Sequence, residues 1–248
     1  MKQNKVTFLV YIWALVVSGS GYGQTSSLEK AHYNWFDTTT GMETSNLMEG
    51  TLVVEKYATL DGYHKFYTSN DYVNGHIVFD GETYFDVDLK YDLYEDELLL
   101  PLRSTSKALM LKLVKERVGQ FEIDGRIFVR LGPWEDNKDE VSGFFEVLAK
   151  TAFFTLLKKH KKEGYTNFKR NMVLYKFVKK DQYYIEKGGK LYKVKNKRDI
   201  IKIFPESKTH LNQLPLEPLR KSNMDAYLVK LMDVVHQNWL PLKSPVIE

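Results

Sequence analysis

The chain of 248 residues contains no cysteine. This absence excludes disulfide bonds, cysteine nucleophiles and thiolate metal ligands. It also excludes a lipoprotein anchor, which needs a cysteine directly after the cleavage site of its signal peptide. The fold must therefore be held by its hydrophobic core, and 43% hydrophobic with 14% aromatic residues are enough for a substantial one.

Long apolar runs are almost as scarce, since only residues 6–17 form one. Lys2 and Lys5 precede this run, and the small, turn-prone residues 18–23 follow it. This order predicts a secretory signal peptide over residues 1–23. The run is too short to span a bilayer, which needs about 20 apolar residues. We therefore expect an exported protein without a transmembrane span after cleavage, located in the periplasm, at the outer membrane or outside the cell.

Sequence motifs of catalysis are also missing from the mature region. It contains no GxSxG, no P-loop and no GxGxxG, and the six histidines do not occur in HExxH or another zinc spacing. From these patterns we predict no catalytic residue, no cofactor and no metal site.

The clearest structural signal is the alternation in "TYFDVDLKYDLY", residues 83–94. A period of two predicts a β-strand with one buried and one solvated face. The apolar residues expected on the buried face are Phe85, Val87, Leu89, Tyr91 and Leu93.

Three short turn signals connect strand-like runs. Asp80-Gly81, Asp124-Gly125 and Gly188-Gly189 each supply the positive φ angles of a two-residue hairpin turn, which makes its two strands antiparallel. Further strands are expected at residues 51–57, 109–114, 144–150, 153–159 and 172–179. The predicted fold class is mainly β, an antiparallel sandwich or barrel built of hairpins, with a short α-helical C-terminal tail.

The tail begins after the last hairpin. Asn196 is expected to cap a short helix that ends at Pro205, and Ser222 with Asp225 has the spacing of a capping box for a second helix. Met224, Leu228, Leu231 and Val235 then fall on one helical face. The predicted organisation is a signal peptide (1–23), a polar N-terminal segment (24–50), an antiparallel β domain (51–196) and a helical tail packed on it (197–248).

Several longer stretches resemble an uncharacterised family of exported Bacteroidetes envelope proteins. They are "YVNGHIVFDGETYFDVDLKYDLYEDELLL", "KERVGQFEIDGRIFVRL", "GFFEVL" and "DQYYIEKGGKLYKVKNKRDIIKIFPESK". The resemblance covers roughly residues 48–237 and implies bacterial origin and an address in the cell envelope. It carries over no catalytic residue. "LEPLRKSN" departs from the family's more continuous lysine-rich helix, which leaves the length of that helix open.

Acidic residues gather in residues 80–97, where the net charge is −7. Alternation places Asp86 and Asp88 on one side of the strand, so a calcium ion between them is an alternative to a solvated face. A regular strand does not supply the six to eight converging oxygens of a calcium site, and we favour the solvated face. A carboxylate-dependent hydrolase stays open as a less favoured function, because two carboxylates would suffice for it.

Basic residues gather in residues 158–202, where the net charge is +12. Within this region we predict a surface for an anionic partner, with Tyr192 and Val194 directed to the core. Its six residues are Lys187, Lys190, Lys193, Lys195, Lys197 and Arg198. Export argues against nucleic acid and favours anionic lipid, lipopolysaccharide or an acidic glycan. The competing interpretation is that these lysines only keep exposed strands soluble.

The sequence thus favours an exported, non-catalytic envelope protein that acts in binding or scaffolding. The first alternative is a β-barrel carrier of an apolar ligand, because aromatic residues are frequent on the expected strands. The opposite charges of residues 80–97 and 158–202 also leave a homo-oligomer open.

Overall fold

The structure is a computed structural model that describes residues 46–102, 109–132, 141–169 and 172–243. The predictions for the signal peptide, residues 1–23, and for most of the polar segment, residues 24–50, lie outside the described residues. Asn46–Met48 forms a 3-10 helix, η3, and belongs to a unit that ends at Met48. The fold described below belongs to a second unit, Glu49–Glu248.

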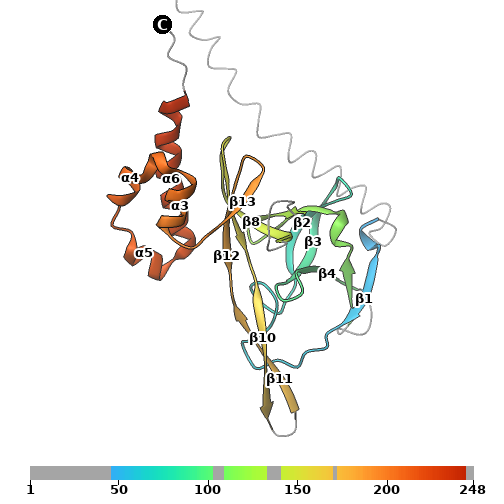
Figure 1. Ribbon diagram of the computed structural model, residues 1–248. Helices are drawn as coiled ribbons and strands as arrows, with labels where there is room; N and C mark the ends of the chain where they lie inside the picture. The colour runs from blue at the N-terminus through green and yellow to red at the C-terminus, as the bar shows by residue number, and fades with distance from the viewer. Residues whose placement is uncertain (1–45, 103–108, 133–140, 170–171, 244–248) are drawn as a thin grey trace, which may run out of the picture. The chain divides into compact units, whose positions relative to one another are not determined.

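An antiparallel sheet of eleven strands dominates the second unit (Figure 1), which confirms the mainly β fold class. Its strand order is β1-β5-β4-β3-β2-β6-β7-β8-β9-β12-β13, and β10 with β11 forms a separate two-stranded sheet. The described strands are β1 (Gly50–Val54), β2 (Val73–Phe79), β3 (Glu82–Asp92), β4 (Glu97–Pro101), β5 (Leu109–Leu113), β6 (Val118–Ile123), β7 (Arg126–Leu131), β8 (Gly143–Lys150), β9 (Thr155–Lys159), β10 (Lys162–Lys169), β11 (Met172–Lys179), β12 (Gln182–Lys187) and β13 (Lys190–Val194).

The three predicted hairpin turns are confirmed. Asp80 and Gly81 have φ angles of 52° and 85°, and Asp124 and Gly125 have 53° and 69°. Gly188 and Gly189, at 58° and 74°, join β12 to β13. Two successive positive φ angles match the right-handed twist of the flanking strands, which explains why these dipeptides fix local pairing.

The alternation predicted for β3 is wrong at one place, because the strand carries a bulge. Tyr84 pairs with Ile77 and Val87 pairs with Gly75, so Phe85 and Asp86 together oppose one residue of β2. Asp86 has a φ of 55°, in the left-handed region. The extra residue turns Phe85 partly out of the buried face and brings Tyr84 into it. The remaining predicted core residues of β3 are buried.

The sheet curls strongly around a core of aromatic rings. Tyr91 of β3 and Phe144 of β8 lie four strand spacings apart in the sheet, roughly 19 Å if it were flat. Their ring centroids are 5.8 Å apart, and Phe121 and Phe128 from the intervening strands pack against Tyr91 at 5.3 and 5.5 Å. The strands from β3 to β9 therefore form a barrel-like curl whose concave face is filled by side chains.

The curl brings the end of β9 back to the turn between β3 and β4. The backbone N–H of Lys162 donates to the carbonyl of Leu93, and Lys159 reaches Asp96 with an Nζ–Oδ2 distance of 2.7 Å. The Tyr91 hydroxyl donates to the other oxygen of Asp96 at 2.6 Å. We refer to this closure between Leu93–Asp96 and residues 159–162 as the seam.

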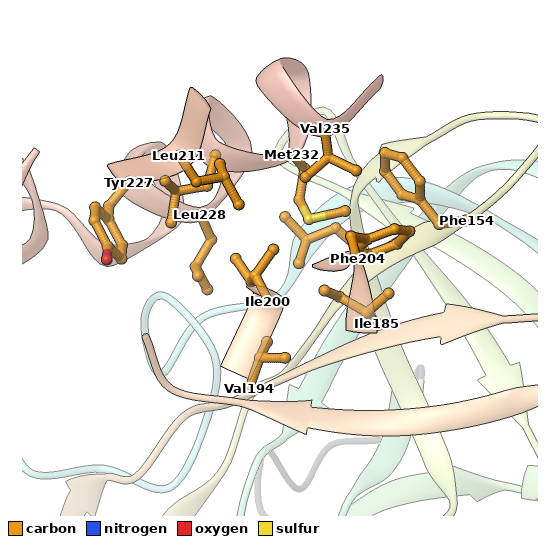
Figure 2. Packing of buried hydrophobic residues seen from close by; sticks show 12 residues of the cluster. Phe154, Ile185, Val194, Ile200, Phe204, Leu211, Tyr227, Leu228, Met232 and Val235 are labelled. Carbon is orange, nitrogen blue, oxygen red and sulfur yellow. The ribbon is translucent and has the colours of Figure 1, made fainter. Parts of the chain in front are cut away.

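In the described part of the chain four α-helices follow β13, and a 3-10 helix, η5 (Pro205–Ser207), joins the first two of them. The four α-helices are α3 (Lys197–Ile203), α4 (Lys208–Asn212), α5 (Glu217–Ser222) and α6 (Met224–Lys243). Figure 2 shows side chains from α3, α4 and α6 meeting side chains from β12, β13 and the start of β9. The fully buried members of this helix–sheet core include Ile185, Ile200, Leu228, Leu231 and Val235. The helical face predicted for α6 therefore covers the sheet.

Only the first predicted helix cap is confirmed. The side-chain oxygen of Asn196 accepts from the backbone N–H groups of Arg198 and Asp199, as an N-cap should. The capping box of Ser222 and Asp225 is wrong. Ser222 ends α5 and its hydroxyl bonds back to carbonyls of that helix, so Asn223 takes its place and accepts from the N–H of Ala226.

The β10–β11 hairpin is attached to the rest of the unit at its base. Segment 58–63 runs beside β11, where Tyr175 and Phe177 exchange three backbone hydrogen bonds with it. Tyr57 and Tyr94 add ring contacts to Phe177 at 5.5 and 5.0 Å. The inner half of this hairpin is thus held by both backbone and aromatic contacts.

Candidate functional site

The six predicted surface residues are divided between different surroundings. Lys187 and Lys190 pair across the turn of the β12–β13 hairpin. Lys187 is turned toward the helices, where its Nζ donates to the carbonyl of Ile203 at 3.0 Å and lies 4.3 Å from the ring centroid of Phe204. It stabilises the end of α3 and is not part of an open basic surface.

Lys193 lies on the opposite face of β13 from Val194, as the alternation predicts. Val194 is buried in the helix–sheet core, but Tyr192 is 37% exposed, so the prediction that Tyr192 faces the core is wrong. The cause is its place on β13, an outer strand of the sheet. Lys193 itself is exposed, and its Nζ lies 5.9 Å from the ring centroid of Tyr184.

Of the last three predicted residues, Lys195 precedes the N-cap of α3, and Lys197 and Arg198 are its first two residues. The Nζ of Lys197 donates to the carbonyl of Leu214, whereas Lys195 and Arg198 are exposed. Lys197 and Arg198 line a separate pocket of about 430 Å³ beside α5. The structure therefore does not bring the six residues together.

Instead, Lys193 meets two lysines of the seam around one pocket. This pocket of about 450 Å³, here named the lysine pocket, is lined by Lys159, Lys161 and Lys193 together with Asp96, Gln182 and Tyr184. β9, β12 and β13 are neighbours in the sheet, and Gln182 pairs with Lys159 while Lys193 pairs with Tyr184. Antiparallel pairing of these three strands places Lys159 and Lys193 at the pocket, and Lys161 follows the end of β9.

The electrostatics of the lysine pocket leave positive charge uncompensated. The Nζ of Lys159 is bound by Asp96 at 2.7 Å and donates to the carbonyl of Ser142 at 3.0 Å. Within the described part of the chain, neither Lys161 nor Lys193 forms an ion pair, and both are exposed. Burial lowers the pKa of Lys159; Asp96 opposes this shift, whereas nearby Lys115 and Lys161 add to it.

Neutral donors complete the wall of the lysine pocket. The Tyr184 hydroxyl donates to the side-chain oxygen of Gln182 at 2.5 Å. The Gln182 amide keeps its two N–H donors for a ligand. With three ammonium groups and one carboxylate, the pocket is suited to an anion such as a phosphate, sulfate or carboxylate.

A second cluster of ionisable residues lies on the concave face, between the aromatic core and the helix–sheet core. We name it the charged strip. It consists of Arg126, Glu146, Lys158, His160, Asp181, Asp225 and Tyr183. Positive and negative side chains alternate along it, from Arg126 on β7 to Asp225 on α6.

Glu146 is the central carboxylate of the charged strip and is only 3% exposed. One of its oxygens is bound by Arg126, and the other lies 2.5 Å from Nε2 of His160. Burial acts to raise the pKa of Glu146, but the hydrogen bonds from His160 and Arg126 bring it below its usual value. Both oxygens are therefore engaged in internal contacts.

Asp225 joins the charged strip to the helices. It accepts from the Lys158 ammonium at 2.8 Å and from the Tyr183 hydroxyl at 2.5 Å. Burial acts to raise the pKa of Asp225, but these hydrogen bonds lower it overall. The strip thus contributes to holding α6 on the sheet.

The acidic residues of β3 do not converge on a common point. Asp86 sits in the bulge, and Asp92 is buried against Lys65 with a distance of 2.6 Å. Among the described residues no group of three or more histidine, aspartate or glutamate side chains is arranged to hold a metal ion. Nor does any helix in the described part have the length and apolar character needed to cross a membrane.

Lys159 and Lys161 are the functional candidates that the sequence interpretation missed. They alternate with Lys158 and His160 in "KKHKK", so a period of two would have placed Lys159 and Lys161 on one face. Their proximity to Lys193 also required the pairing of β9 with β12, which no local pattern reveals.

The chain matches no protein-family model, no curated protein and no solved structure. The resemblance to exported Bacteroidetes envelope proteins therefore stays a proposal.

Proposed function

We propose that this is an exported, non-catalytic protein of a bacterial cell envelope that binds an anionic group through the lysine pocket. The anionic group is a phosphate, sulfate or carboxylate of an envelope component, such as a lipid headgroup, lipopolysaccharide or an acidic glycan. This replaces the broader basic surface of six residues by a defined site that keeps Lys193 and adds Lys159 and Lys161.

The observation that carries the proposal is the uncompensated charge of one pocket. Lys161 and Lys193 line a space of about 450 Å³ whose lining contains a single carboxylate, Asp96. A protein surface normally scatters lysines or pairs them, because like charges destabilise one another. An anion that bridges these lysines would relieve the repulsion and use the Gln182 donors at the same time.

The apolar-carrier alternative has less support, because aromatic rings fill the concave face of the curl. Tyr91, Phe121, Phe128 and Phe144 contact one another there, and each is at most 1% exposed. A hydrolase would need a carboxylate that can approach a substrate, whereas Glu146 is buried between its two partners.

Replacing Lys161 and Lys193 by glutamine should weaken phosphate binding by about tenfold, because two charge-assisted contacts are lost. The measurement is isothermal titration with inorganic phosphate, with sodium chloride added to keep the ionic strength constant. A matched control replaces two exposed helix lysines, Lys208 and Lys230, by glutamine and should leave the affinity unchanged. Equal affinity of both variants, or an unmodified protein that does not bind phosphate, would disprove the site.

The proposed export has its own test. If residues 1–23 are a signal peptide, the protein recovered from the envelope of the producing bacterium should begin near Gln24. Intact-mass analysis of that fraction measures the start. Full-length protein confined to the cytoplasm would contradict the envelope address while leaving the lysine pocket as a binding site.

A further inference from the structure

Large apolar side chains are exposed on the β10–β11 hairpin, whose two strands are labelled in Figure 1. Phe168 is 79% exposed, Met172 58%, Tyr165 48% and Val173 44%. Contiguous apolar surface of this kind is costly in water and usually marks a docking surface. None of these residues belongs to the lysine pocket or the charged strip.

The exposed side chains occupy both faces of the hairpin. Phe168 and Val173 are cross-strand partners on one face. Met172 pairs with Lys169 and lies on the opposite face, because side chains alternate along a strand. Tyr165, nearer the base, lies on the same face as Met172. A protein partner normally covers one face of a two-stranded sheet. Apolar residues on both faces are better suited to immersion in a medium that surrounds the hairpin.

The net charge of the hairpin indicates which surrounding medium it suits. Residues 162–179 contain five lysines or arginines and one acid, Glu163, so the net charge is +4. A second copy of the same hairpin would bring the same charge and be repelled. Near an anionic bilayer, in contrast, each such cation contributes to attraction. The charge therefore favours anionic lipid over self-association.

The backbone limits how deeply the hairpin can enter. In the described structure β10 and β11 form a sheet of two strands, and their outer edges carry backbone groups that hydrocarbon cannot satisfy. Segment 58–63 bonds to β11 only near its base, at Tyr175 and Phe177. Two or three residue pairs of the outer half cover about 7–10 Å, which matches the depth of the interfacial layer.

We propose that the outer half of the β10–β11 hairpin docks the protein onto an anionic bilayer. Phe168, Val173 and Met172 enter the interfacial layer, and the positive charge of the hairpin attracts it to the anionic headgroups. Lys161 is seven residues from Phe168, about 23 Å along an extended strand. The lysine pocket would therefore stay beyond the headgroup layer, so in the docked protein its ligand would be an anionic group other than the headgroups of that bilayer.

The test is co-sedimentation of the full chain with vesicles of phosphatidylcholine, with or without phosphatidylglycerol. Binding should require phosphatidylglycerol, and replacing Phe168 and Met172 by serine should weaken it by at least about tenfold, because two apolar anchors are lost. The matched control replaces Leu52 and Val54, which are 59% and 60% exposed on β1, by serine and should bind like the original. The Lys161→Gln/Lys193→Gln variant should also retain binding, which separates this proposal from the proposed function.

Because the chain has no cysteine, a single one can report the contact directly. Asn167→Cys carries an environment-sensitive dye near the anchors, and Lys208→Cys carries it on α4. The dye at position 167 should brighten with anionic vesicles and the dye at 208 should not. The proposal would be overturned if the dye at position 167 did not brighten, or if the Phe168→Ser/Met172→Ser variant bound vesicles like the original protein. It would also be overturned if sedimentation velocity showed the original protein as a dimer and this variant as a monomer.

Discussion

Phe128→Ala should lower the free energy of unfolding by about 3–5 kcal/mol, the typical cost of deleting a buried aromatic ring. Phe128 is fully buried, and its ring stacks on Phe121 at a centroid distance of 4.7 Å. It also touches Tyr67, Tyr91 and His160 at 5.4, 5.5 and 5.6 Å. Alanine would leave a cavity where the curl of the sheet is tightest, and these rings cannot all move to fill it.

Urea unfolding of Phe128→Ala and of a neighbour on the other face measures this effect. Ile127 is 42% exposed on the same strand, and Ile127→Ala should cost no more than about 0.5 kcal/mol. A loss below about 1 kcal/mol for Phe128→Ala would mean that the curl is not held by its rings. The comparison thus tests the concave core and not merely the strand propensity of β7.

Local chemistry made the hairpins predictable. Asp80-Gly81 and Asp124-Gly125 specify their turns through positive φ angles, and nothing distant is needed to read them. The same holds for the cap at Asn196, whose side chain reaches only the next two or three residues. The bulge at Phe85 and Asp86 escaped this reading because alternation in the sequence continues through it unchanged.

Two strands were missed because tertiary contacts create them. β4, "ELLLP", lacks alternation and ends in proline, and β10, "KEGYTNFK", contains glycine and polar residues typical of a loop. In β10 the absence of a side chain at Gly164 admits the ring of Phe177, which would lie 2.9 Å from an added Cβ. Such pairing is decided by a partner strand and not by the strand itself.

The candidate site was predictable only in part. Charge counting found the basic region, and alternation placed Lys193 opposite Val194. That Lys187 would instead bind the carbonyl of Ile203 depends on where α3 packs. The meeting of Lys193 with Lys159 and Lys161 depends on the order of β9, β12 and β13 and on the closure of the seam. The packing of α3 and the order of these strands are long-range features, and the spacing of residues in the sequence does not predict them.

Removing the carboxylate of Glu146 should be the second large effect. Glu146→Ala is expected to cost about 3 kcal/mol, at the low end for a buried ion pair because Arg126 can turn to water. His160 is only 6% exposed, so its ring cannot turn to water and would lose its hydrogen-bond partner inside the protein. Glu146→Gln should cost only about 1 kcal/mol, because the amide can still accept from Arg126 and donate to His160 Nε2. Asp88→Asn, a change at an exposed carboxylate, is the matched control and should have almost no effect.

The stabilisation that the Glu146 carboxylate provides should decrease as the pH falls. The pKa of Glu146 is lowered by folding, so its contribution is present above the pKa of the unfolded chain and is lost as pH falls through the folded value. The cost of Glu146→Gln, measured by urea unfolding, should therefore shrink as the pH falls from about 7 through the folded pKa of Glu146, because the Glu146 carboxylate of the original protein is then protonated too. A cost that is constant over this range would show that the Glu146 carboxylate does not stabilise the fold by its charge. In that case the charged strip would be held by shape and hydrogen bonding alone.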